Sequence, residues 1–204
     1  LLAEMAQSEH QFTMFDLPGH GDSLKWDFRG ALHDVSAAVA ASFLDQKMDL
    51  IGHSFGASVA LRLAVEHPDL VRSLILIEPV IFSLGFAYEP ASKNAFLLDH
   101  AEFDRAIARD EFVSAARAFH QIWGSGQSWD RLPDKVQRGM VDKIHLIPAA
   151  ASHVVEDAYG FCTAGLLEKI EAPVLLLQGS ASSAPMPAVI SSLQARLPRS
   201  FVKT

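Results

Sequence analysis

The sequence contains few of the residues that build disulfide frameworks, zinc sites or membrane spans. Its 204 residues include one cysteine, Cys162, so a disulfide framework within the chain is excluded. No apolar run approaches the length of about 20 residues that a spanning helix needs. The nine histidines are scattered, without the spacing of zinc ligands. We expect a cytoplasmic protein with no membrane segment, metal ion or cofactor.

The chain also has few positively charged residues. It contains 17 Lys and Arg residues and 24 Asp and Glu residues, which gives a formal net charge of −7, and the basic residues form no cluster. Nucleic acid is therefore an unlikely partner, and a small-molecule substrate is the partner we expect. Half of the residues are hydrophobic, which is enough for one buried core with an insertion. The oligomeric state is not readable from the sequence.

The most informative stretch is a Gly-x-Ser-x-Gly motif at residues 52–56. An apolar run, 48–51, precedes it, and an alanine-rich helical pattern follows it. This order is typical of a nucleophile elbow, in which a serine is carried on a sharp turn between a strand and a helix. Ser54 must then adopt a strained backbone conformation. We expect glycine to be required at positions 52 and 56, because a side chain at either position would collide with the turn.

The rest of the chain alternates predicted strands and helices, which favours a mostly parallel α/β sheet. Strand 48–51 and strand 73–77 are predicted to be buried, and the elbow helix is predicted to stop before Pro68. The other predicted elements are a helix at 1–9, strand 12–15, a loop at 16–23, helix 31–44, strand 173–177, a loop to 187, a helix to 197 and a strand beginning at 201.

Between residues 81 and 161 no convincing strand is predicted. Helical periodicity is present at 112–123 and again at 134–144, with Gly124, Ser125 and Gly126 between them. We interpret this block as a helical insertion over the C-terminal edge of the sheet. The expected organisation is a core part at 1–81, a helical cap at 82–161 and a second core part at 162–204.

Three features, taken together, resemble a known family. They are Asp16-x-Pro-Gly-His-Gly-x-Ser23, the elbow at Ser54, and the strand 173–177 that ends in Gln178-Gly179. In this order the chain resembles an α/β-hydrolase with a helical cap. The resemblance implies that Ser54 is the catalytic nucleophile and that the backbone N–H of Phe55 is one oxyanion-hole donor. The second donor would lie upstream of Leu1.

The resemblance leaves the catalytic acid in an unusual place. Most relatives carry an aspartate at the position of Ser182, and no Asp or Glu occurs from 172 to 204. A subset places the acid at the end of the preceding strand, where this chain has Glu78. A carboxylate there is costly unless a polar group engages it, and an imidazole N–H would do so. The other interpretation is a Glu78 that faces solvent or caps the helical insertion.

The catalytic base is expected outside this chain. In the family it is a histidine after the eighth strand, which here would lie beyond Thr204. His53 would point away from Ser54, His20 would border the pocket, and the remaining histidines lie in other contexts.

Four aromatic residues either line an acyl pocket or form core: Phe86, Phe96, Trp123 and Trp129.

The sequence therefore predicts a serine hydrolase of esters, or of related acyl or activated C–C substrates, which acts through an acyl-enzyme at Ser54. The alternative is a non-catalytic ligand-binding protein on a degenerate hydrolase fold. Both ends look like cuts, so the 204 residues alone are expected to be inactive. They are also expected to be marginally stable or prone to aggregate, because strands 12–15 and 48–51 would lack a common neighbour.

Overall fold

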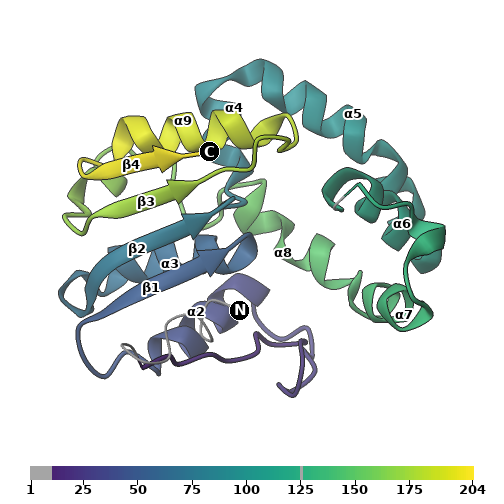
Figure 1. The fold of residues 1–204 in the computed structure, drawn as a ribbon, viewed down its shortest axis with the longest axis horizontal. Helices are drawn as coiled ribbons and strands as arrows, with labels where there is room; N and C mark the ends of the chain where they lie inside the picture. The colour runs from purple at the N-terminus through teal and green to yellow at the C-terminus, as the bar shows by residue number, and fades with distance from the viewer. Residues whose placement is uncertain (1–10, 125) are drawn as a thin grey trace.

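Four parallel strands form the sheet in the part of the chain that the structure describes, in the order β1-β2-β3-β4 (Figure 1). The computed structural model describes residues 11–124 and 126–204. The strands are β1 (Met48–His53), β2 (Val71–Ile77), β3 (Val174–Leu177) and β4 (Ser200–Lys203). All three pairings are parallel. The predicted α/β class with a parallel sheet is confirmed.

Helices of the α/β part cover one face of this sheet. They are α2 (Leu32–Ala41), α3 (Phe55–Glu66) and α9 (Pro185–Arg196). Leu74 and Leu76 of β2 share a face with Val174 and Leu176 of β3, and all four are buried in one cluster with α3 and α9. Because side chains alternate along a strand, this face supplies the core.

The opposite face of the sheet carries an apolar row that is only partly covered. The strand register aligns Ile51, Ile75, Leu175 and Phe201 across the four strands. Ile51 is 46% exposed and Phe201 is 67% exposed. The prediction that strand 48–51 is buried is therefore wrong, because β1 lies at the edge of the sheet and alternates between covered and exposed residues.

The end of α3 agrees with the prediction, whereas α9 begins two residues before the predicted end of its loop at 187. Helix α3 ends at Glu66, two residues before Pro68, because proline disfavours a helical conformation in the residue before it. Pro185 lies in the first turn of α9, where its missing N–H costs nothing. Short 3-10 turns complete the connections at Pro68–Leu70, Trp129–Arg131 and Leu167–Lys169.

The block from 82 to 161 contains helices and loops but no strand in the part that the structure describes. It contains α4 (Phe82–Tyr88), α5 (Pro90–Ile107), α6 (Phe112–Trp123), α7 (Asp134–Lys143) and α8 (Leu146–Val154). Helices α5–α7 extend away from the sheet on the side where the strand arrows end, and α8 returns toward the core (Figure 1). This segment has its own buried cluster, which includes Phe103, Ala115 and Trp129.

Two sequence predictions at the beginning of the chain have different outcomes. The strand predicted at 12–15 is wrong: these residues are irregular and join no strand of the described sheet. A short apolar run such as this one is ambiguous, because only a neighbouring strand makes it a strand. The helix predicted at 1–9 lies outside the described residues.

Among the helices that are described, none combines the length and the hydropathy needed to cross a membrane.

Candidate active site

Ser54 lies at a sharp turn between β1 and α3. It is the N-cap of α3, with φ 54° and ψ −120°, a backbone conformation that non-glycine residues rarely adopt. A Cβ at position 52 would lie 2.4 Å from the carbonyl oxygen of Gly56 and 2.6 Å from the Cα of Ala57. Gly52 therefore allows the close approach that the motif predicts.

The corresponding expectation for Gly56 is wrong for the described part of the chain. A Cβ at Gly56 would meet no atom within 4 Å there. The difference is geometric: position 52 faces the first turn of α3, whereas position 56 is on the half-exposed outside of that turn.

Glu78 occupies the equivalent position on the neighbouring strand. The register pairs His53 with Ile77, so Ser54 and Glu78 each follow the last paired residue of their strands. The N–H of Ser54 donates to the Ile77 carbonyl at 2.9 Å, and the N–H of Glu78 donates to the Leu177 carbonyl at 2.9 Å. Glu78 also has a positive φ, 47°. Ser54 and Glu78 therefore follow adjacent strands at the C-terminal edge of the sheet, where neighbouring strand backbones are about 5 Å apart.

The carboxylate of Glu78 is held by the loop after β3. Its Oε1 accepts a hydrogen bond from the N–H of Gly179 at 2.9 Å and another from the hydroxyl of Ser182. The residue is half-buried, and its carboxylate is engaged within the protein. The carboxylate therefore has partners in the loop after β3, and its role as the catalytic acid stays a prediction.

Phe55 begins α3, directly after Ser54. The N–H groups in the first turn of a helix have no partner within the helix, so the amide of Phe55 is available to a ligand at the elbow. The Phe55 ring packs edge-on against the ring of His33 on α2, with centroids 5.4 Å apart. This contact places α2 directly behind the elbow.

A hydrogen-bond chain connects α2 to the same turn. The hydroxyl of Ser58 donates to the Phe55 carbonyl at 2.7 Å, so it accepts from Nε2–H of His33 at 3.2 Å. Nδ1 of that tautomer can then accept from the Arg62 guanidinium at 3.3 Å. Burial, followed by the nearby His153 and Arg62, lowers the pKa of His33 from 6.5 to about 3. His33 is therefore a neutral support of the elbow.

His33, Asp34 and His153 are the one group of metal-ligating residue types that comes together in the described chain, with ligand atoms within 4.8 Å. The two imidazole rings stack at 4.7 Å and are within 12° of parallel, so their in-plane lone pairs cannot converge on one ion. The Arg62 guanidinium also forms an ion pair with Asp34 in the same cluster. This arrangement disfavours a metal ion and favours a structural role.

No histidine of the described residues is hydrogen-bonded to Ser54 or Glu78. His100 uses both ring nitrogens elsewhere: Nδ1–H donates to the Phe96 carbonyl at 2.9 Å, and Nε2 accepts from Trp123 at 3.1 Å. His120 donates to the Gln127 carbonyl at 2.7 Å, and His153 contacts Asp34 at 3.2 Å. These histidines therefore serve the structure of the helical segment and its contact with α2.

The aromatic residues considered for an acyl pocket pack mainly against one another. Phe82 stacks on Trp123 at 5.5 Å, and Phe96 stacks on His100 at 3.8 Å. Phe86 contacts Phe96 at 5.4 Å, and Trp129 is buried in the cluster of the helical segment. In the described structure these contacts assign the aromatic residues to the core.

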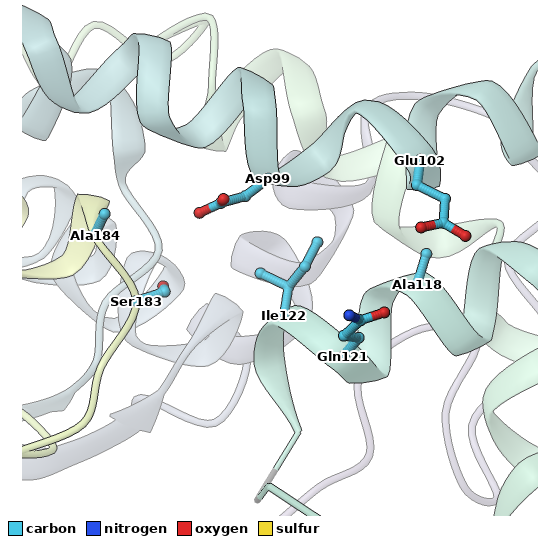
Figure 2. Close-up of a pocket in the computed structure, with 7 residues that line it drawn as sticks. All are labelled: Asp99, Glu102, Ala118, Gln121, Ile122, Ser183 and Ala184. Atoms are coloured by element: carbon cyan, nitrogen blue, oxygen red, sulfur yellow. The ribbon is translucent and has the colours of Figure 1, made fainter. Parts of the chain in front are cut away.

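A cavity of about 360 Å³ lies between α5, α6 and the loop before α9. Figure 2 shows the Asp99 side chain extending from α5 toward the side where Ser183 and Ala184 lie, with Ile122 of α6 below it. Ser183 follows Ser182, so the cavity lies beside the loop that holds Glu78. Two carboxylates in its wall, Asp99 and Glu102, disfavour anionic ligands in this space.

Comparison with known proteins identifies the family of this chain. The family model for the alpha/beta hydrolase fold matches residues 1–204. The chain therefore belongs to the α/β-hydrolase family. It is also similar to a solved α/β-hydrolase from Sphaerobacter thermophilus, with a TM-score of 0.61, 18% identity, and coverage of 92% of this chain and 71% of that one. This likeness supports the fold.

Curated relatives carry names of esterases and lipases. The chain is 30% identical over 194 residues to a pimeloyl-[acyl-carrier protein] methyl ester esterase of Neisseria meningitidis, covering 89% of this chain and 56% of that protein. It is 35% identical over 107 residues to lipase LipV of Mycobacterium tuberculosis, covering 50% of this chain and 40% of that protein. The chain thus spans little more than half of the esterase.

Two parts of the site were not anticipated from the sequence. The sequence marks Ser182 only as the position where most relatives carry an aspartate, whereas the structure places its hydroxyl on Glu78. His33 and Ser58 match no motif in the sequence, although both are buried at the elbow. The sequence carries no clear signal for His33, because it lies outside the stripe of large apolar residues on helix 31–44 and shares a face with the small residues Ser36 and Ala37.

Proposed function

We propose that this protein is a serine hydrolase that cleaves carboxylic esters, or related acyl or activated C–C substrates, through an acyl-enzyme at Ser54. The observation that carries the proposal is the pair of strained residues, Ser54 and Glu78, at the ends of adjacent parallel strands. Backbone strain at non-glycine residues concentrates at functional sites, and here it affects the two residues that a catalytic triad would require.

The proposed reaction has two halves. Ser54 Oγ attacks the substrate carbonyl while a histidine takes its proton, and the N–H of Phe55 stabilises the oxyanion by about 3–4 kcal/mol. The C–O bond to the alcohol breaks, and the histidine returns the proton to the leaving oxygen. Water then hydrolyses the acyl-enzyme by the same sequence. Glu78 holds the histidine in the required tautomer.

Two components of this mechanism are assigned to the full-length protein. We place the base histidine and the second oxyanion donor outside residues 1–204. The proposed mechanism uses no metal ion and no cofactor. We accordingly expect negligible turnover from the 204 residues alone, because a serine without a base is a weak nucleophile.

The experiment that tests the proposal compares wild type with Ser54→Ala in the full-length protein. Turnover of p-nitrophenyl acetate and labelling by a fluorophosphonate probe should both be lost in Ser54→Ala. Ser42→Ala removes an exposed hydroxyl at the end of α2 and should leave both unchanged. Equal turnover by wild type and Ser54→Ala would contradict the proposal. Wild-type protein that resists the probe yet binds small esters would favour the non-catalytic alternative.

A further inference from the structure

The loop after β3 is shaped around the carboxylate of Glu78. Two hydrogen bonds converge on one oxygen, Oε1: one from the N–H of Gly179 at 2.9 Å and one from the hydroxyl of Ser182. Ser182 Oγ is also 2.8 Å from the Gly179 carbonyl oxygen, which keeps the hydroxyl within the loop. A serine hydroxyl has a single hydrogen, and the charged acceptor binds it more strongly. The hydroxyl therefore points at Glu78.

The backbone of the loop is fitted to the same oxygen. A Cβ at position 179 would lie 2.9 Å from Oε1 of Glu78 and 3.1 Å from Oγ of Ser182. The carboxylate thus occupies the space that a side chain at 179 would take. These contacts join residues 101 and 104 positions apart in the chain, so they do not follow from local turn geometry.

The other carboxylate oxygen is left open. Within residues 11–124 and 126–204, Oε2 of Glu78 has no hydrogen-bond partner. An acid that orients an imidazole needs one oxygen fixed by the protein and one oxygen free to accept the ring N–H. The contacts of Glu78 supply this division.

We infer that Ser182 is a positioning residue of the active site, whose hydroxyl, with the amide of Gly179, orients Glu78 so that Oε2 faces the catalytic histidine. This inference rests on the proposed function of Ser54 and Glu78. Ser182 does not touch substrate and acts only through the carboxylate. Its removal lowers the fraction of enzyme in which Glu78 holds the histidine correctly, which affects the chemical step more than substrate binding.

The contact has a second consequence. Because the hydroxyl of Ser182 touches Oε1, an aspartate at position 182 would place a carboxylate in the same region of space. The acid could then be supplied from β3 instead of β2. With Glu78 still present, two carboxylates would face each other, which disfavours ionisation of both and lowers activity.

The test uses the full-length protein, with p-nitrophenyl acetate as substrate and kcat and KM measured across pH. Ser182→Ala should lower kcat about tenfold with little change in KM and should shift the pH profile of kcat. Ser182→Thr retains the hydroxyl and should recover most of the loss. Ser180→Ala, an exposed serine of the same loop, is the matched control and should behave as wild type. Thermal melting checks that each variant is folded.

A relocation experiment gives a second readout. Glu78→Gln should be nearly inactive, and Glu78→Gln/Ser182→Asp should regain at least tenfold, whereas Glu78→Gln/Ser182→Ala should not. A folded Ser182→Ala with wild-type kcat and pH profile, or double variants of equal activity, would overturn the inference. Those results leave the proposed function standing, because its own failure is seen when Ser54→Ala turns over substrate as fast as wild type.

Discussion

Nε2–H of His33 donates to the hydroxyl of Ser58, which in turn donates to the carbonyl of Phe55, the residue after Ser54. Helix α2 is thereby tied to the first turn of α3. This series of hydrogen bonds requires a neutral imidazole. The Arg62 guanidinium lies 3.3 Å from Nδ1 of His33, so a protonated ring would place two positive charges side by side. The stability of the elbow therefore depends on the protonation of one buried histidine.

This dependence predicts a loss of stability in acid. The pKa of His33 is about 3 in the folded protein against 6.5 ordinarily, so between these values the unfolded chain binds a proton that the folded chain does not. This contribution to the free energy of unfolding is fully present above about pH 6.5 and is lost as the pH falls toward 3. Its slope is at most about 1.4 kcal/mol per pH unit.

His33→Gln isolates the effect. The glutamine amide can donate to Ser58 and accept from Arg62, but it does not titrate. The free energy of unfolding, measured with urea, should fall more steeply from pH 6.5 to 4 for wild type than for His33→Gln. The same measurement at pH 8, where His33 is neutral in both states, gives the difference between the two proteins that is due to packing alone. Parallel slopes for the two proteins in the acid range would contradict the assignment.

The two glycines of the elbow should respond differently to alanine. Gly52→Ala places a Cβ 2.4 Å from the Gly56 carbonyl, which forces the backbone of the elbow to move and should cost more than about 3 kcal/mol. Gly56→Ala meets open space in the first turn of α3, so it should leave stability unchanged or raise it by up to about 1 kcal/mol. Urea unfolding of the full-length protein measures both. Similar destabilisation by the two substitutions would show that the described packing around Gly56 is incomplete.

Arg196 clamps the segment that leads into β3. Its guanidinium donates to the carbonyl of Phe161 at 2.7 Å, to the carbonyl of Thr163 at 2.6 Å and to Glu168 at 2.9 Å. The same group lowers the pKa of the Glu168 carboxyl to about 2. One planar fork thus satisfies three acceptors.

Arg196→Lys keeps the charge but cannot reproduce this fork, so it should lower the free energy of unfolding by about 1–3 kcal/mol. Arg199→Lys is the matched control, because Arg199 is exposed and, in the described structure, its guanidinium donates one hydrogen bond, to the Glu171 carbonyl at 3.0 Å. Its effect should stay within about 0.5 kcal/mol. Denaturant unfolding compares the two. Equal losses would mean that charge, and not the fork geometry, holds the segment.

The sequence predicted most elements of the fold because their signals are local. The turn at Ser54 follows from small residues next to it, and the end of α3 follows from Pro68. The prediction for residues 12–15 failed because an apolar run becomes a strand only beside another strand. The exposure of Ile51 likewise depends on what lies beyond β1 in space.

The site shows the same division between local and distant signals. Ser54, Phe55 and Glu78 could be selected because each directly follows a strand or begins a helix. The contact from Ser182 to Glu78 spans 104 residues, and the contact from His33 to Ser58 spans 25. No spacing rule connects such residues. They become visible only when the parallel sheet brings the ends of its strands to one edge.

Backbone strain at Ser54 leads to a final prediction about stability. A non-glycine residue with φ 54° and ψ −120° costs about 1–3 kcal/mol, and glycine adopts that conformation without a steric penalty. Ser54→Gly should therefore raise the free energy of unfolding by about 1 kcal/mol, after the greater entropy of glycine in the unfolded chain is subtracted. Ser54→Ala keeps the Cβ and should leave stability within about 0.5 kcal/mol of wild type. Both variants remove the hydroxyl, so their difference in urea unfolding measures the relief of strain minus the entropy cost of glycine. If glycine were no more stable than alanine, the turn at residue 54 would not be strained, and the strongest reason for placing chemistry there would be gone.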